Sequence, residues 1–144
     1  MIQKDKELLL KNSIARLYPY KVKCNVYKRI GTLVGLSDYG AEIDYGNGED
    51  TTCEIQYCLL YLRPMSSMTE EELYEVQKIL GKGVEIQDDF ISIIDSSIHS
   101  FTYLELLAVF DWLNAHHFDC YGLIKKGLAL EAPKDMYVIN HNRL

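Results

Sequence analysis

The residues whose side chains are best suited to metal binding or catalysis lie together in the C-terminal part of the chain: His116, His117, Asp119 and Cys120. Imidazole, carboxylate and thiolate groups serve as metal ligands and as nucleophiles or general bases in hydrolytic sites. Adjacent histidines on a helix point about 100° apart, and the i, i+4 spacing of a helical metal pair is absent here. Histidines in a last helical turn more simply bond the free carbonyl groups there. We therefore keep these four residues as weak site candidates and expect no metal.

A second candidate group is basic and surrounds the first predicted strand. Lys21, Lys23, Lys28 and Arg29 could together form an edge that contacts phosphate groups. The whole chain carries a formal net charge of -6, which repels a phosphate backbone unless a local patch dominates. A solvated face is the simpler interpretation, and a nucleic-acid-binding accessory protein remains an alternative.

The remaining polar residues indicate no enzyme. Five carboxylates fall in or beside predicted turns, where hydration makes an acidic rim the better interpretation: Asp38, Glu42, Asp44, Glu49 and Asp50. The sequence holds no P-loop, GxGxxG or GxSxG motif. We expect no catalytic residue and no cofactor, and a small hydrolase or nucleotide-binding protein is the second alternative.

Cysteine usage and hydropathy predict a cytoplasmic chain. The four cysteines have neither CxxC nor zinc-ribbon spacing, so we expect free thiols in a reducing compartment. The first twelve residues mix charges with leucines and lack the apolar core of a signal peptide. No apolar run approaches the roughly 20 residues that span a bilayer.

The first half of the chain predicts a helix followed by a small sheet. Within residues 1–20, a helix over 5–17 places Leu10, Ile14 and Leu17 on one face. Residues 21–65 then contain five short strand-like runs with tight turns, and polar and apolar side chains alternate in the first and third of them: 21–26, 32–36, 41–45, 51–55 and 59–62. This pattern favours a small SH3-like antiparallel β-barrel.

The second half, residues 66–133, reads as mainly helical. Capping boxes at Thr69 and Thr102 open two helices, and residues 84–95 can form a hairpin between them. The helix from Thr102 is apolar on nearly every side, which is typical of a central core helix or a subunit interface. Asp119 is expected to cap a short helix that ends at Gly127, and residues 134–144 form a tail. We predict an α+β fold that unfolds as one cooperative domain over residues 1–144.

Two blocks carry a resemblance to known sequences. The segment LRPMSSMTEEE at residues 62–72 and the blocks LNAHHFD, GLI and GLALEAP between residues 113 and 133 stand in this order. The chain thereby resembles uncharacterised short proteins encoded by tailed phages and prophages of gut anaerobes. The resemblance implies a phage-derived protein of the host cytoplasm, and it carries over no activity and no site residue. The chain departs from the group at Cys120 and Tyr121, where a tyrosine followed by arginine or a similar pair is expected.

The function that the sequence favours is a non-enzymatic protein-interaction module. Eleven tyrosines give the chain many side chains that cover apolar surface while keeping a polar hydroxyl, as interfaces require. The expected partner is an unidentified host or phage protein, and the sequence leaves the oligomeric state open.

Overall fold

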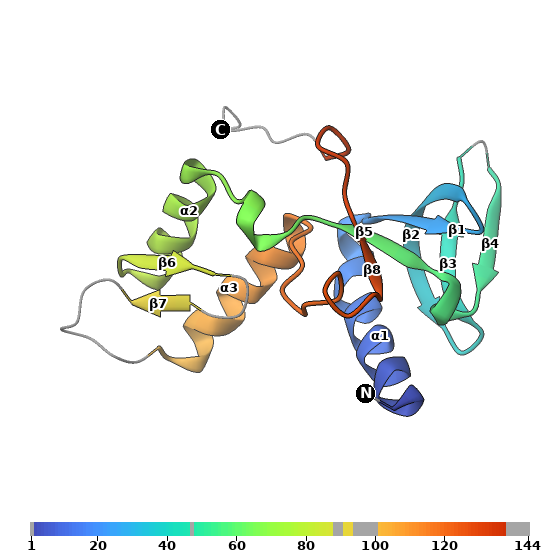
Figure 1. Ribbon diagram of the computed structural model, residues 1–144, viewed down its shortest axis with the longest axis horizontal. Coiled ribbons are helices and arrows are strands. Elements are labelled where there is room, and N and C mark those ends of the chain that lie inside the picture. Colours follow the sequence, from blue (N-terminus) through green and yellow to red (C-terminus); the bar gives the residue numbers. More distant parts are fainter. Residues whose placement is uncertain (1, 47, 88–90, 94–100, 138–144) are drawn as a thin grey trace.

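The computed structural model of the protein describes residues 2–46, 48–87, 91–93 and 101–137 (Figure 1). Its α+β architecture has two lobes that lie side by side. The sheet lobe combines helix α1 (Gln3–Leu17) with the main sheet. The hairpin lobe combines helices α2 (Glu70–Leu80) and α3 (Tyr103–Ala115) with the hairpin of β6 (Val84–Ile86) and β7 (Ile91–Ile93).

Helix α1 forms where the apolar spacing predicts it. Leu10, Ile14 and Leu17 are buried on one face, together with Ser13, whose hydroxyl donates to the Leu9 carbonyl at 2.7 Å. The helix ends in a 3-10 turn, η1 (Tyr18–Tyr20), which contains Pro19. The chain then enters the main sheet through a left-handed residue, Lys21.

The main sheet has six strands in the order β4-β3-β2-β1-β5-β8. They are β1 (Lys23–Val26), β2 (Arg29–Ser37), β3 (Gly40–Asp44), β4 (Asp50–Cys53), β5 (Leu59–Leu62) and β8 (Ala129–Glu131). Every pairing is antiparallel except that of β5 with β8, which is parallel. Tyr27 and Lys28 both have positive φ in the two-residue turn between β1 and β2, as a type I′ turn requires.

The predicted SH3-like antiparallel barrel is found only in part: β1 to β5 pair antiparallel in one sheet, but no closed barrel is found among the described strands. Among the described strands the sheet is open and mixed, with β4 at one edge and β8 at the other. The physical reason is the arrival of the C-terminal arm: β8 pairs in parallel with β5, so β5 joins β1 to β8 instead of closing the sheet onto β4. The predicted fifth run, residues 59–62, forms strand β5, and a 3-10 turn, η2 (Ile55–Tyr57), precedes it.

Both predicted capping boxes are confirmed. The Thr69 hydroxyl accepts the Glu72 amide at 3.2 Å while the Glu72 carboxylate accepts the Thr69 amide at 3.0 Å. Thr102 and Glu105 repeat this arrangement at the start of α3. The hairpin predicted within residues 84–95 also forms, although as a separate two-stranded sheet, and its turn residues 88–90 lie outside the described residues.

The short helix predicted after Asp119 does not form. Residues 120–127 make successive turns, because Gly122 and Gly127 have positive φ and a right-handed helix cannot pass through them. The start of the predicted tail is also ordered: the Tyr137 hydroxyl donates to the Tyr61 carbonyl at 2.7 Å and accepts the Lys23 amide at 2.8 Å. Residues 138–144 of that tail lie outside the described residues.

Each lobe has its own hydrophobic core, and the segment after α3 contributes to both. Leu123 and Ala129 belong to the core of the sheet lobe, with Ile14, Leu33 and Leu60. Phe118 belongs to the core of the hairpin lobe, among residues that include Val76, Val109 and Leu113. This shared segment supports the prediction that the lobes unfold together, which remains a prediction.

Candidate functional site

The predicted basic edge is partly engaged by the protein itself. The Arg29 guanidinium donates two hydrogen bonds of 2.6 Å to the Glu49 carboxylate and lies 4.0 Å from the Tyr45 ring centre. Hydrogen bonding within this pair raises the pKa of Arg29 and lowers the pKa of Glu49. The Lys23 ammonium donates to the Thr32 hydroxyl at 2.8 Å. Two of the four predicted phosphate-binding residues thus have internal partners, while Lys21 and Lys28 are exposed.

A hollow of about 570 Å³ lies beside Arg29. Its wall contains three tyrosines, Tyr27, Tyr45 and Tyr57, together with the carboxylates of Glu49, Asp50 and Glu54, and we call it the tyrosine hollow. Residues of β4 and of the β1–β2 turn both line it, although β3 and β2 separate these elements in the sheet. The main sheet is therefore curled, and the tyrosine hollow lies between β4 and the β1–β2 turn.

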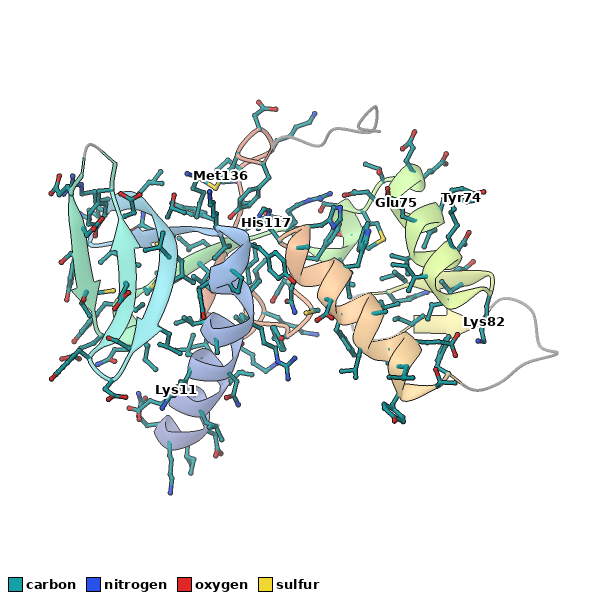
Figure 2. The ribbon with its side chains drawn as sticks, turned by 180° about the vertical axis from the view of Figure 1, so that it is seen from behind. Lys11, Tyr74, Glu75, Lys82, His117 and Met136 are labelled. Atoms are coloured by element: carbon teal, nitrogen blue, oxygen red, sulfur yellow. The ribbon has the colours of Figure 1, made fainter. Side chains whose placement is uncertain are left out.

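The adjacent histidines point to different partners. His116 Nδ1 donates to the Trp112 carbonyl at 2.8 Å, and its ring stacks on Trp112. His117 Nε2 donates to the Tyr20 carbonyl at 2.8 Å, and its ring stacks on Tyr137. Figure 2 shows His117 between the two lobes. Burial lowers the pKa of His117, and the Tyr20 hydrogen bond only partly opposes this.

Asp119 and Cys120 have structural partners as well. The buried Asp119 carboxylate accepts the Leu123 amide at 2.8 Å and the Ile124 amide at 3.0 Å, so it caps a turn rather than a helix. The Cys120 thiol donates to the Asn114 side-chain oxygen at 3.3 Å. Burial, aided by the Asp119 charge, raises the pKa of Cys120 to about 12, so its nucleophilic thiolate is disfavoured near neutral pH. The four candidates are neighbours in sequence, but in the structure each side chain bonds a different partner, and they form no common site.

Sequence reasoning missed the buried ion pair at the junction of the lobes. Arg63, which follows β5, donates two hydrogen bonds of 2.7 Å to the Glu72 carboxylate on α2. Its guanidinium also lies 4.1 Å from the Phe118 ring centre. Burial alone would raise the pKa of Glu72, but the bonds from Arg63 and the Thr69 amide lower it below its ordinary value. The one available signal was that Arg63 directly follows an apolar strand.

Backbone hydrogen bonds also connect this point to the end of α3. The Arg63 amide donates to the His117 carbonyl at 2.8 Å, and the Asp119 amide donates to the Arg63 carbonyl at 2.8 Å. A second hollow, of about 900 Å³, opens beside Arg63, with Pro64, Thr69, Glu131 and Tyr137 in its wall. Because the Arg63 guanidinium is already paired with the Glu72 carboxylate, it does not provide an unpaired charge for a ligand in this hollow.

Helix α3 presents an apolar face outward. Its buried residues are Val109, Leu113 and Asn114, all toward its C-terminal half. Four large side chains keep much of their surface exposed: Tyr103 (74%), Leu104 (65%), Leu107 (48%) and Phe110 (39%). They recur at helical spacing and form what we call the α3 face. Helix α3, for which the sequence left a core helix and a subunit interface as alternatives, is therefore packed on one side only.

Comparisons of the chain with models of known protein families, with curated proteins and with solved structures gave no match. Within the described ranges, no group of three or more histidine, cysteine, aspartate or glutamate residues is arranged to hold a metal ion. Among the helices of those same ranges, none is long and apolar enough to cross a bilayer.

Proposed function

We propose that this protein is a non-enzymatic interaction module that binds another protein through the α3 face. The observation that carries the proposal is the exposure of Tyr103, Leu104, Leu107 and Phe110 on one helix. A helix that is apolar nearly all round fits either a core or an interface, and α3 buries only part of its surface within the chain. Contiguous exposed apolar side chains are typical of protein-binding surfaces.

The α3 face is also preformed, which favours binding. The Thr102 capping box fixes the first turn of the helix. Glu105 in that turn accepts a hydrogen bond of 2.8 Å from the Lys82 ammonium, which ties α3 to the end of α2. A partner would therefore meet an ordered helix, and little conformational entropy would be lost on this side of the interface.

The chemistry of the face indicates an apolar helix as the partner's contacting element. Ridges of side chains spaced three and four apart pack into the grooves of another helix. Asp111 is exposed at the rim of the α3 face, and the chain as a whole is acidic. Basic residues flanking the partner's apolar stripe would complement this charge. The sequence resemblance supports a phage origin, so the proposed partner is a host or phage protein.

The alternative functions have weaker support. The engagement of Arg29 by Glu49 and of Lys23 by Thr32 weighs against a nucleic-acid edge at β1 and β2. The internal partners of His117 and Cys120 weigh against a hydrolytic site after α3. A salt-dependent shift on DNA or RNA would favour the first alternative over the interaction module.

The proposal is tested by paired variants of the tagged full-length chain. Leu107→Glu places a charge on the α3 face, and Val34→Glu places one at a similarly exposed site on the main sheet (48% and 43% exposed). Proteins retained from the cells that naturally make the chain are quantified by mass spectrometry. We expect at least one protein to be lost with Leu107→Glu and kept with Val34→Glu.

Two results would contradict the proposal. One is a set of retained proteins that responds equally to both variants, which would place binding elsewhere. The other is a wild-type dimer, measured by analytical ultracentrifugation, that Leu107→Glu dissociates, because the α3 face would then be covered by a second copy of the chain.

A further inference from the structure

Two side chains of the tyrosine hollow form one exposed aromatic surface. The ring centres of Tyr27 and Tyr57 lie 5.4 Å apart, and the ring planes meet at an angle of 31°. Tyr27 is 74% exposed and Tyr57 is 46% exposed, so solvent reaches both rings. The face of an aromatic ring carries partial negative charge and attracts a cation placed over it. We call these two rings the tyrosine platform.

The tyrosine platform is held by short, hydrogen-bonded turns. Tyr27 and Lys28 both have positive φ, a conformation that residues other than glycine rarely adopt. The Asn25 side-chain oxygen accepts the Lys28 amide at 3.1 Å and supports this turn. Tyr57 belongs to η2, in which its amide donates to the Glu54 carbonyl at 3.0 Å. A ligand would therefore meet two rings that are already in place, and little conformational entropy would be lost on binding.

The same hollow already accommodates one guanidinium, which belongs to the protein itself. Arg29, Tyr45 and Glu49 all line the hollow. The Arg29 guanidinium lies 4.0 Å from the Tyr45 ring centre and donates two hydrogen bonds of 2.6 Å to the Glu49 carboxylate. A planar guanidinium suits this arrangement because it stacks on an aromatic face and pairs with both oxygens of a carboxylate. This wall therefore provides an internal example of how it can bind an arginine.

The tyrosine platform has carboxylates in the same wall but no internal cation. Within the described ranges, no lysine or arginine lies over either ring, and neither Asp50 nor Glu54 belongs to an ion pair. The Glu54 carboxylate accepts a hydrogen bond of 2.6 Å from the Gln56 side-chain amide, a neutral donor that leaves its charge in place. Because Arg29 and Glu49 offset each other, the wall keeps the negative charges of Asp50 and Glu54.

The hollow runs along strand β4, at an edge of the main sheet. All four residues of β4 line it. Among the described strands β4 pairs only with β3, so the backbone groups on its outer side have no strand partner. An extended peptide can pair with such an edge while one of its side chains enters a neighbouring pocket. Figure 1 shows β4 at the end of the molecule opposite the hairpin lobe.

We propose that the tyrosine hollow binds an arginine side chain from an extended segment of a partner protein. The guanidinium lies over the tyrosine platform and pairs with the carboxylates of Asp50 and Glu54, as Arg29 does with Tyr45 and Glu49. The segment that carries it lies beside β4. This inference concerns the sheet lobe and does not rest on the function proposed for the α3 face.

The probe is a short blocked peptide that carries one arginine between glycines and serines. It is titrated into isotope-labelled full-length protein, and two-dimensional NMR spectra show which backbone amides respond. Three further probes are compared with it: the same peptide with lysine, the same peptide with citrulline, and free N-acetylarginine amide. Citrulline keeps the shape of arginine but lacks its charge, and the free amide lacks the flanking backbone.

We expect the arginine peptide to shift the signals of Tyr27, Thr52 and Tyr57. It should bind about threefold more tightly than the lysine peptide, because an ammonium cannot stack and pair as a guanidinium does. It should bind about tenfold more tightly than the citrulline peptide, which cannot form charge-assisted hydrogen bonds. The free amide should also bind more weakly than the arginine peptide, because it cannot pair along β4.

Variants assign the binding to the hollow. Tyr57→Ala and Glu54→Gln should each weaken binding of the arginine peptide several-fold. Tyr39→Ala is the matched control, because Tyr39 is 86% exposed and lies outside the residues that line the hollow, and it should leave binding unchanged. Leu107→Glu on the α3 face should leave it unchanged as well, so failure of one proposal is distinguishable from failure of the other.

Four results would overturn the proposal. They are an arginine peptide that shifts no signal of the hollow, equal binding of the citrulline or lysine peptide, equal binding of the free amide, and an equal loss of binding in Tyr39→Ala and Tyr57→Ala. The first three are measured on the wild type alone, so they decide the matter even where a variant fails to fold.

Discussion

Arg63→Met should destabilise the protein far more than Arg29→Met, because the same ion-pair geometry occurs once in the interior and once at the surface. Both arginines donate two short hydrogen bonds to one carboxylate. The Arg63 and Glu72 side chains are 9% and 2% exposed, whereas those of Arg29 and Glu49 are 52% and 56% exposed. Arg63 also donates to the His116 carbonyl at 3.4 Å and to the Ser67 carbonyl at 3.3 Å, so the two pairs differ chiefly in burial and secondly in these added bonds.

The expected magnitude follows from the charge left behind. Removing one partner of a buried pair leaves an uncompensated charge in the interior and costs about 3–5 kcal/mol. With a urea m-value of roughly 2 kcal/mol/M, Arg63→Met should lower the urea midpoint by about 2 M. Arg29→Met should change it little, since solvent screens an exposed pair.

The assay is urea unfolding followed by far-UV circular dichroism at several pH values. The lowered pKa of Glu72 means that its pairing stabilises the folded state above the ordinary carboxyl range, and that this stability is lost as the pH falls through the folded-state pKa. The deficit of Arg63→Met should therefore shrink in acid, where its unpaired Glu72 becomes neutral. Equal effects of the two variants at neutral pH would refute the reasoning.

Three further predictions concern the segment after α2. Asp119→Ala should lower the free energy of unfolding by about 2–4 kcal/mol, since two backbone amides lose their acceptor. The metal content of the protein should not change, and loss of a stoichiometric metal in the variant would contradict the capping role. Leu113→Ala should lower the free energy of unfolding by about 2–5 kcal/mol because Leu113 is buried, whereas Leu107→Ala should lower it by less than about 1 kcal/mol. If thermal melting gave the reverse order, the buried and exposed faces of α3 would be misassigned. Because the pKa of His117 is lowered in the folded state, wild-type stability should fall as the pH drops below about 6.5, the pKa in the unfolded state. His117→Asn should remove that part of the pH dependence of stability. If the variant and the wild type had the same dependence of stability on pH, His117 would not be its source.

Local signals predicted the elements well. The capping boxes at Thr69 and Thr102 depend on residues a few positions apart, so the sequence contains all the information needed. The predicted closure of the barrel was not found, because closure depends on a contact between distant segments. The pairing of β5 with β8 joins Leu60 to Ala129, and the short apolar runs around them do not specify a partner.

For the candidate site residues, too, local features could be predicted from the sequence and long-range contacts could not. Carboxylates, histidines and lysines can be identified in sequence, but their partners come from elsewhere in the fold, as with His117 and the Tyr20 carbonyl. The role of Asp119 was half predicted: it caps backbone amides, but those of a turn, since Gly122 interrupts the expected helix. For α3, the sequence left a core helix and an interface as alternatives, and only the packing shows that much of its apolar surface remains exposed.

Site-specific photo-crosslinking tests the proposed interaction most directly. A benzophenone amino acid replaces Leu107 on the α3 face or, as the control, Val34 on the main sheet, in the full chain inside the cells that naturally make it. We predict a discrete covalent adduct with one other protein from position 107 and none from position 34. No adduct at position 107, the same adducts at both positions, or an adduct only with a second copy of this chain would contradict the account.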